Sequence, residues 1–220
     1  DGTVALATHR SGNATVVNDA DLYFANSSVG GNLSAGATTG NIRDSGTLTI
    51  TGTSSFTTSA RDATIALNDT SNAFGGAVTL STTGSSAYAD IDGGTTALNI
   101  AQSSVGGNLY LRSGNVSGIT DSGTVTVGGN LLATTDANNG AINLGTLAVD
   151  GTVKLTTNGS GNATVVNDAG LNFAASTVGG ALSATATTGN ISDSGNLAVP
   201  GAATFITGAD GSNIVLDSSG

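Results

Sequence analysis

The protein has 220 residues, of which 34 are glycine, 15 are acidic and five are Lys or Arg, giving a formal net charge of −10. It contains no Cys, Met or Trp, and all its acidic residues are Asp. The lack of cysteine excludes disulfides, zinc–thiolate sites and thiol catalysis. The negative charge excludes nucleic-acid binding by phosphate neutralisation, and no apolar run of about 18 residues is present that would insert into a membrane.

The composition favours strands over helices. Glu is absent and Lys154 is the only lysine, so the strong helix formers with long charged side chains are nearly missing. Ser, Thr, Asn and Gly, which dominate, prefer strands, turns and caps. With 38% hydrophobic and 9% charged residues, the chain also lacks the composition of a disordered protein. We therefore expect an all-β fold.

A long internal repeat organises the chain. Residues 1–71 align without a gap on residues 150–220, with 42 of 71 positions identical. The longest identical block runs from Ser11 to Ala20 and again from Ser160 to Ala169. We interpret residues 1–220 as one solenoid segment that consists of a long repeat, 1–149, and a partial second copy, 150–220.

A shorter period lies inside the long one. Nine glycine turns, each followed by a short strand, are spaced 21 to 31 residues apart; they lie at Gly2, Gly31, Gly52, Gly76, Gly107, Gly129, Gly151, Gly180 and Gly201. Strands are predicted at 47–51, 77–80 and 124–127, where apolar residues alternate with threonine. This pattern predicts a parallel β-helix, or β-solenoid, of about nine coils of 21–31 residues, six of them in one long repeat. Crossover geometry predicts a right-handed coil.

Comparison of the two copies separates inward from outward positions. The positions assigned inward keep their residue, as at Val4/Val153, Leu6/Leu155, Leu22/Leu171, Phe24/Phe173, Leu33/Leu182, Ile42/Ile191, Leu48/Leu197, Phe56/Phe205, Ile65/Ile214 and Leu67/Leu216. Many changes fall on positions assigned outward, such as Ala5/Lys154 and Tyr23/Asn172. A lysine is tolerated only where the side chain reaches water.

Polar residues are expected to serve the turns. Recurring Asn, Ser and Thr are predicted to form ladders between coils. The three Asp-Ser-Gly segments, at 44–46, 121–123 and 193–195, are interpreted as turns in which Asp accepts a bond from its own backbone two residues on. The longest coils leave room for outward loops at 9–20, 84–95 and 158–169, where a binding surface would be grafted.

No catalytic, cofactor-binding or metal-binding residue is predicted. His9 is the only histidine and its counterpart is Asn158, so it is interpreted as a solvated loop residue. Asp90 and Asp92 share a strand face, as do carboxylates at 18–21, but neither pair matches a calcium-binding repeat. No basic residue stands beside a carboxylate cluster, the arrangement that a polysaccharide lyase needs. The sequence therefore predicts no enzyme and no cofactor.

The repeat units resemble a known family. GGNLSAGATTGNIRDSGTLTITGTSSF and STVGGALSATATTGNISDSGNLAVPGAATF are similar to repeats of large bacterial exoproteins of the filamentous haemagglutinin type. The resemblance implies a β-helical shaft secreted by the two-partner pathway, and an extracellular or bacterial cell-surface location. It covers essentially the whole chain.

We expect a structural protein: the rigid shaft of a secreted or cell-surface fibre or adhesin, which mediates adhesion or forms an extracellular filament. Its expected partners are further copies of itself, through end-to-end or lateral contacts, or a host or neighbouring cell surface. One alternative is a binding module whose long-coil loops contact a glycan or a protein. Another is an ice-binding solenoid with outward Thr-x-Thr columns, although unequal coil lengths argue against a flat array. The repeat breaks off at Ser218–Gly220, so we expect either a window on a longer chain or a stacking subunit.

Overall fold

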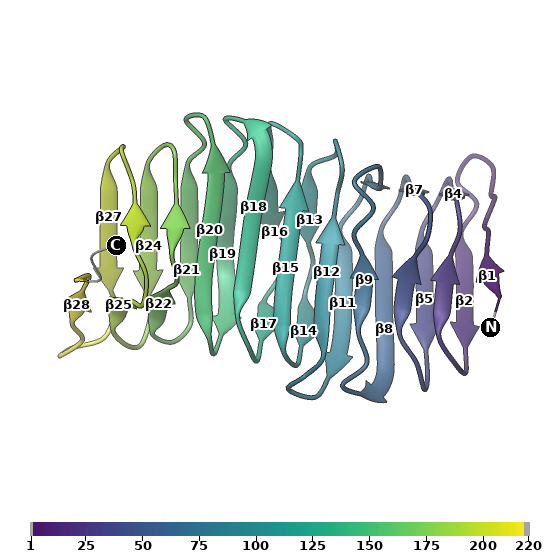
Figure 1. Ribbon diagram of the computed structural model, residues 1–220, viewed down its shortest axis with the longest axis horizontal. Coiled ribbons are helices and arrows are strands. Elements are labelled where there is room, and N and C mark those ends of the chain that lie inside the picture. Colours follow the sequence, from purple (N-terminus) through teal and green to yellow (C-terminus); the bar gives the residue numbers. More distant parts are fainter. Residues whose placement is uncertain (1, 218–220) are drawn as a thin grey trace.

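The computed structural model describes residues 2–217 and is a single parallel β-solenoid (Figure 1). Its strands pair in parallel between successive coils, and no helix occurs among the described residues. The predicted all-β parallel β-solenoid is therefore confirmed. Asp1 and the segment Ser218–Gly220, where the sequence repeat breaks off, lie outside the described residues.

The strands form three sheets that run along the rod, and we name them A, B and C. Sheet A has 13 strands: β1 (Thr3–Val4), β3 (Leu22–Phe24), β6 (Ile42–Asp44), β9 (Ile65–Leu67), β12 (Tyr88–Asp92), β15 (Asn108–Ser113), β18 (Leu131–Asn138), β20 (Thr152–Asn158), β22 (Leu171–Phe173), β23 (Ser176–Thr177), β25 (Ile191–Asp193), β26 (Leu197–Ala198) and β28 (Ile214–Val215). Sheet B has three: β4 (Ser27–Val29), β7 (Leu48–Ile50) and β10 (Ala73–Phe74).

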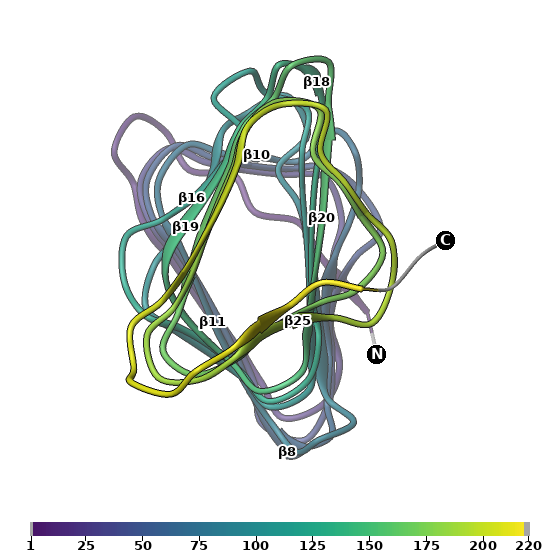
Figure 2. The same ribbon diagram turned by 90° about the vertical axis from the view of Figure 1, so that its left-hand side faces the viewer.

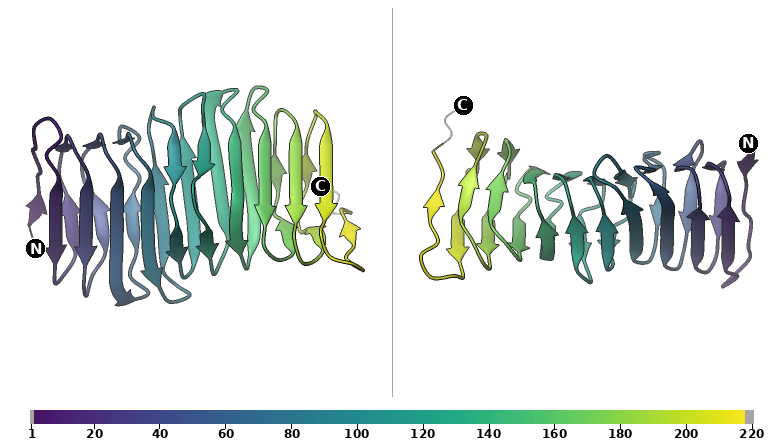
Figure 3. Two further views of the ribbon diagram at one scale, coloured as in Figure 1. Left: turned by 180° about the vertical axis from the view of Figure 1, so that it is seen from behind. Right: turned by 90° about the horizontal axis from the view of Figure 1, so that it is seen from below.

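Sheet C has 12 strands: β2 (Ala14–Asn18), β5 (Leu33–Ala37), β8 (Ser54–Arg61), β11 (Val78–Thr83), β13 (Leu98–Ile100), β14 (Ser103–Val105), β16 (Ile119–Asp121), β17 (Val125–Val127), β19 (Ile142–Val149), β21 (Ala163–Asn167), β24 (Leu182–Ala186) and β27 (Ala203–Thr207). Viewed along the rod, β11, β16 and β19 of sheet C follow one long wall of an elongated cross-section and β18 and β20 of sheet A follow the other, while β25 of sheet A crosses between the two walls (Figure 2). Views from behind and from below show the coils stacked in one continuous rod (Figure 3). The outer faces of sheets A and C are therefore the two broad surfaces of the molecule.

The core is the stack of alternating side chains that point inward from both walls. Leu22, Phe24 and Ile42 are fully buried, as are their counterparts in the second copy. Phe56 and Phe74 pack edge to face, with ring centroids 6.1 Å apart. At the ends of the described chain, Leu197 and Phe205 are only partly buried, and Ile214 is 46% exposed. The predicted inward positions are thus confirmed, with weaker burial in the terminal coils.

The coils are shorter and more numerous than the sequence predicts. Residues paired between adjacent coils lie 20 positions apart at Leu22 and Ile42, and 24 apart at Ile65 and Ala89, and the remaining steps along this wall fall within that range. The 11 strands on the main path of sheet A therefore define about ten turns, seven of them in one long repeat. The predicted number of about nine coils is close to the ten observed, but the predicted spacings of up to 31 residues are too long because they treat glycines on opposite walls as neighbours. The Gly31 N–H donates to the carbonyl oxygen of Gly12, not to Gly2.

The long repeat divides into two units that occupy opposite walls. The motif Gly-Gly-Asn-Leu or Gly-Gly-Ala-Leu leads into β5 and β24 on sheet C, but into β15 on sheet A. Likewise, the Ile-x-Asp strands β6 and β25 lie on sheet A, whereas β16 lies on sheet C. Successive units are thus offset by three and a half turns. The partial second copy holds a further unit. We call the units that contain β5, β15 and β24 the first, middle and third units, and the middle unit is rotated half a turn about the rod axis from the other two.

The paired glycines of each unit are required at a corner where two coils meet closely. A Cβ atom on Gly30, Gly106 or Gly179 would overlap the carbonyl oxygen of the residue stacked beneath it. Those lower residues are equivalent in the three units and all have a positive φ: Arg10 at 55°, Gly84 at 96° and Gly159 at 63°. A left-handed residue supports each Gly-Gly corner, and only glycine fits above it.

Polar side chains join the coils as the sequence predicts. The Asn13 Oδ1 accepts a bond from the Asn32 N–H at 2.8 Å, and the Asn32 Oδ1 accepts one from the Thr53 N–H at 2.9 Å. An equivalent Asn ladder runs along sheet A, where the Asn108 Oδ1 accepts from Asn130 N–H at 2.8 Å. Such bonds satisfy turn amides that no strand partner reaches.

The aspartates of the Asp-Ser-Gly segments bond to the next coil, a contact that the predicted local turns do not include. Asp44 accepts a bond from the Asp69 N–H at 3.2 Å, Asp121 from Thr146 N–H at 2.7 Å and Asp193 from Asp217 N–H at 3.1 Å. Each partner lies 24 or 25 residues further on, in the next coil. Because the next coil passes directly above, its amides compete successfully with the local backbone for the carboxylate.

Buried serines form a third recurring link, in line with the predicted ladders of Asn, Ser and Thr between coils. Ser27, Ser103 and Ser176 occupy the same position in the three units and are buried. Each hydroxyl accepts a bond from a backbone N–H of the neighbouring coil and donates to a carbonyl two residues earlier; for Ser103 these partners are Leu80 at 3.0 Å and Ala101 at 2.8 Å. A serine at a strand corner thus replaces backbone pairing where the strands bend.

Candidate functional site

The middle unit carries an unusual set of side chains on the outer face of sheet A. Tyr88 and Asp90 project from β12, and Asn108, Tyr110 and Arg112 project from β15. The two strands are paired in register, with Tyr88 opposite Asn108 and Asp90 opposite Tyr110. We call these five residues the tyrosine face. The chain contains three tyrosines, and two of them lie here.

An ion pair holds one side of the tyrosine face in place. The Arg112 Nη1 lies 2.7 Å from the Asp90 Oδ1, and the Asn68 Nδ2 donates to the Asp90 Oδ2 at 2.9 Å. The Asp90 side chain is 14% exposed and that of Arg112 is 34% exposed. A partly buried, charge-assisted pair of this kind fixes both side chains more firmly than a fully solvated one.

Two tyrosine rings form the other side of the face. The ring centroids of Tyr88 and Tyr110 are 6.2 Å apart, with an edge-to-face angle of 80°. The Asn108 Nδ2 donates to the Tyr110 Oη at 3.2 Å. Both rings are half-buried, and Leu132 follows Tyr110 in register on the next coil. The face therefore combines an ordered apolar surface with polar groups at its edge.

Asp92 lies next to the tyrosine face but is buried, with 4% of its surface exposed. Its Oδ1 accepts a bond from the Gly94 N–H at 2.8 Å. Burial raises the pKa of this carboxyl above its usual range; the Gly94 bond and the nearby Arg112 oppose that shift, and the charges of Asp136 and Asp90 add to it. Asp90 pairs with Arg112 and the Arg112 charge also acts on Asp92, so the positive charge of this guanidinium is compensated by neighbouring carboxylates.

The equivalent strands of the other two units carry only small polar residues or glycine at these outward positions. Register and motif match Tyr88 with Asn13 and Asn162, and Asp90 with Thr15 and Thr164. They match Tyr110 with Ser34 and Ser183, and Arg112 with Gly36 and Thr185. The first and third units agree at three of the four positions, whereas the middle unit differs from both at all four. The solenoid therefore folds without the tyrosine face.

The tyrosine face is not predicted from the sequence, and the expectation that no basic residue lies beside a carboxylate is wrong for Arg112 and Asp90. No basic residue stands beside a carboxylate cluster in the sequence, yet the structure pairs Arg112 with Asp90 across 22 residues. Arg112 lies on sheet A, whereas Asp121 of the second Asp-Ser-Gly segment lies on sheet C, so the structure does not bring these two residues together. The alternating strand at 88–92 and the position of Arg112 in the following strand are the only signals for the pair in the sequence.

His9 and Asp21, which the sequence analysis considers as candidate site residues, lie in solvent-accessible positions of the first coils. His9 is exposed in a turn, as predicted. The Asp21 Oδ1 accepts a bond from Asn41 N–H at 2.7 Å, and this bond, together with Tyr23, lowers the pKa of that carboxyl. Residues 2–217 hold no group of three or more His, Cys, Asp or Glu side chains placed to bind a metal ion.

Each of the predicted outward loops contains a five-residue strand. Segments 9–20, 84–95 and 158–169 contain β2, β12 and β21, each of which pairs in register with the coil above. Ala89 and Ile91 of β12 are fully buried. The loop prediction is wrong because it follows from the overestimated coil length, which left residues without a place in the walls.

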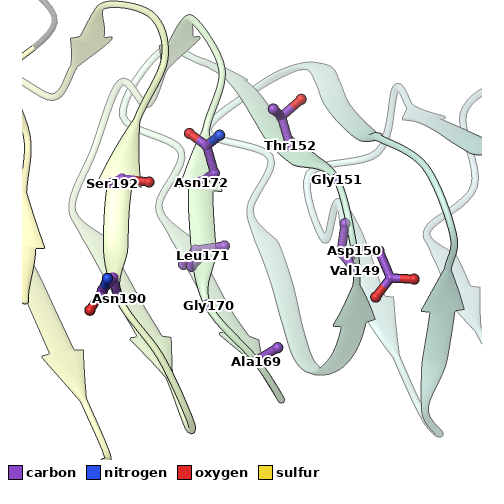
Figure 4. Close-up of a pocket in the computed structure, with 10 residues that line it drawn as sticks. All are labelled: Val149, Asp150, Gly151, Thr152, Ala169, Gly170, Leu171, Asn172, Asn190 and Ser192. Carbon is purple, nitrogen blue, oxygen red and sulfur yellow. The ribbon is translucent and has the colours of Figure 1, made fainter. Parts of the chain in front are cut away.

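A groove of about 460 Å³ opens on sheet A of the third unit (Figure 4). Asn172 and Ser192 lie on paired strands along it, with Asp150 and Thr152 on the preceding coil (Figure 4). In the first unit the position of Asn172 is held by Tyr23, whose hydroxyl donates to the Asp21 Oδ2 at 3.0 Å. The smaller Asn172 and Gly170 at these positions leave the groove open. The buried Asn172 Oδ1 has no hydrogen-bond partner, as is also true of Asn99, its equivalent in the middle unit.

A family model matches the chain over residues 11–81, 87–144 and 160–220, which is most of its length. The chain belongs to the family described as repeats of unknown function, DUF5649. The three DUF5649 matches begin 76 and 73 residues apart, which is the spacing of the first, middle and third units. One family repeat thus corresponds to three and a half turns of the solenoid.

No curated protein and no solved structure matches the chain. Within residues 2–217, no helix has the length and apolar character needed to cross a membrane.

Proposed function

We propose that this chain is a structural element, a rigid shaft segment of a secreted or cell-surface bacterial fibre or adhesin. The observation that supports the proposal is the uninterrupted pairing of coils: strands of sheets A and C follow one another in parallel from the first described coil to the last. A rod of about ten coils at about 4.8 Å per coil would extend roughly 48 Å. Because every coil is bonded to the next, such a rod resists bending and transmits force along its axis.

The composition supports the same role. A net charge of −10 on a chain with few cations keeps neighbouring rods apart unless specific contacts join them. The glycine-rich units GGNLSAGATTGNIRDSG and STVGGALSATATTGNISDSG are similar to shaft repeats of filamentous haemagglutinin-type exoproteins. We therefore infer an extracellular or cell-surface location, with other copies of the chain or a neighbouring cell surface as partners. The shaft itself carries no catalysis and needs no cofactor.

The proposal is tested on the native polypeptide in its producing cells. An antibody raised against the 220-residue chain is used on intact and permeabilised cells, and in an immunoblot of the denatured protein. We expect labelling of intact cells and a band far larger than the 21.0 kDa of this chain. Labelling that requires permeabilisation would contradict the surface location. A band near 21.0 kDa would contradict the role of a shaft segment in a long exoprotein.

A second candidate, ice binding, is favoured by one observation. The outward residues Thr15, Ser34, Ser55 and Thr79 stand in one register row on sheet C, although their coils differ in length. The objection that unequal coils break a flat array therefore does not apply to this row. The parallel row is interrupted at Val17 and Gly36, which weakens the candidate. Thermal hysteresis of the purified chain decides it: a freezing-point gap supports ice binding, and the absence of a gap excludes it.

A further inference from the structure

We propose that the tyrosine face on sheet A is a binding site for a neutral polysaccharide. The proposal goes beyond the shaft role and does not depend on it, because it concerns one outer surface of the rod and not its mechanics or location. It also differs from a site on loops, since the residues project from two paired strands, β12 and β15.

The first argument is the chemistry of the face. Sugar rings present apolar C–H groups on their faces and hydroxyls around their rims. They bind where an aromatic ring meets the C–H face and planar polar side chains meet the hydroxyls. Tyr88 and Tyr110 supply half-buried rings, 6.2 Å apart between centroids. Asn108 and Arg112 flank them with amide and guanidinium donors.

The second argument is that the face is already ordered. Arg112 is held by Asp90 at 2.7 Å, and Tyr110 by Asn108 at 3.2 Å. A guanidinium carries five N–H donors, more than one carboxylate accepts, so Arg112 keeps capacity for a ligand hydroxyl. Side chains that are fixed before binding lose little conformational entropy when the ligand arrives.

The charge of the tyrosine face determines whether a neutral or an acidic polysaccharide fits it. The guanidinium of Arg112 is already paired with the Asp90 carboxylate at 2.7 Å, on a chain with a net charge of −10. An acidic polysaccharide would be repelled by this surface, whereas a neutral one is not. Because its one cation is already paired, the face offers hydrogen-bonding groups to sugar hydroxyls without attracting polyanions.

The fourth argument comes from the repeat. At the four equivalent positions the first and third units hold only Asn, Thr, Ser and Gly, and these suffice for folding. Replacement of all four in the middle unit by Tyr, Asp, Tyr and Arg adds nothing to the inward core. A function for the outer surface accounts for the change.

The test uses affinity electrophoresis of the purified 220-residue chain through gels that contain laminarin, galactomannan, hydroxyethyl cellulose, dextran or polygalacturonate. We expect at least one of the four neutral polymers, and not polygalacturonate, to retard the chain. The double variant Tyr88→Asn, Tyr110→Ser, which installs the residues of the first unit, should weaken retardation about tenfold. The variant Tyr23→Asn, which installs the residue of the third unit, is the matched control and should keep binding.

Tyrosine fluorescence provides a second reading of the same variants. The chain has three tyrosines and no tryptophan, so a sugar stacked on Tyr88 or Tyr110 should change the emission directly. Far-ultraviolet circular dichroism checks that each variant keeps the β-solenoid. The proposal is overturned if no neutral polymer retards the chain, if only polygalacturonate does, or if the folded double variant binds as the parent does.

Discussion

The middle unit and its two neighbours share a backbone and differ on one surface. β12 and β15 have the same parallel pairing and Gly-Gly corner as β2 and β5 in the first unit. Their inward positions change mainly in size, with Ile91 in place of Val16 and Leu111 in place of Ala35. The outward side chains differ in kind: an ion pair and an edge-to-face ring pair in the middle unit, small polar residues in the first. The comparison teaches that coil stacking restricts inward and corner positions, whereas the outer wall is free to acquire chemistry.

The largest effect is expected at the corner glycines, which test whether corner positions are restricted while the outer wall is free to vary. Gly179→Ala in the third unit and Gly106→Ala in the middle unit should each destabilise the protein by about 3 kcal/mol or more, since the added Cβ overlaps a carbonyl oxygen that cannot move away. Gly36→Ala is the control: the nearest atom to its Cβ would be 3.8 Å away, so stability should change by less than about 0.5 kcal/mol. Urea denaturation measures all three. Similar losses in Gly36→Ala and Gly106→Ala would contradict the division.

A smaller loss is expected from the buried corner serine. Ser103→Ala leaves the Leu80 N–H without an acceptor in a buried site, which should cost about 1–3 kcal/mol. The exposed neighbour Ser104 serves as the control, and Ser104→Ala should leave the unfolding midpoint unchanged. Because Ser27 and Ser176 make the same bonds, Ser176→Ala should reproduce the loss in the third unit. Different losses at the two serines would show that the units are not energetically equivalent.

The middle unit should also give the protein a distinct pH dependence. Asp92 replaces the valines of the other units, and its pKa is raised above the ordinary value of 3.8 by burial. From pH 3.8 up to that raised pKa the folded state binds more protons than the unfolded state, so this group's contribution to stability falls as pH rises. Asp92→Asn should remove the fall and be more stable than the parent at pH 7.

Asp21 in the first unit provides the opposite sign. Its lowered pKa means that its contribution is present at neutral pH and is lost as pH drops through the folded value. Asp21→Asn should therefore be less stable than the parent at pH 7 and should converge with it in acid. Thermal unfolding of both variants between pH 3 and 8 compares the two signs; the same sign for both would rule out burial as the cause at Asp92.

The smallest effect concerns the left-handed corner residue. Arg10 has a φ of 55°, whereas its equivalents in the middle and third units are glycines. Arg10→Gly should stabilise the protein by about 0.5–1 kcal/mol, because relief of left-handed strain exceeds the entropy that glycine adds to the unfolded chain. The reverse change, Gly159→Arg, should destabilise by a similar amount. A destabilised Arg10→Gly variant would mean that the arginine side chain, not its backbone, matters at that corner.

The wall and core of the fold are readable from sequence, but the length of a coil is not. Alternation at Leu48 and Ile50, and the identity of Phe24 with Phe173, reveal which side chains point inward because the strand period is fixed. The coil length depends on which glycines stack, and Gly12 below Gly31 carries no signal that distinguishes it from Gly2. The wrong coil length then produces the wrong loops and hides the half-turn offset between units.

The same obstacle conceals the candidate site. Asp90 and Arg112 meet because their strands are adjacent, and that adjacency follows only once a turn is known to span 19 to 24 residues. Asp121 likewise bonds to Thr146 one coil later, although an Asp before Ser-Gly usually indicates a local turn. Contacts across coils are set by stacking, which short sequence patterns do not encode.

Because successive DUF5649 units are offset by half a turn, the number of units decides which side of the rod the following part of the chain faces. Removing or duplicating one unit of three and a half turns would shift everything beyond it by roughly 17 Å and turn it to the opposite side of the rod. Removing two units would shorten the rod and duplicating two units would lengthen it, and in both cases the part beyond would keep its orientation. Any domain carried at the far end would therefore face one way for even changes in repeat number and the other way for odd ones, so a single recombination event would invert what the rod presents.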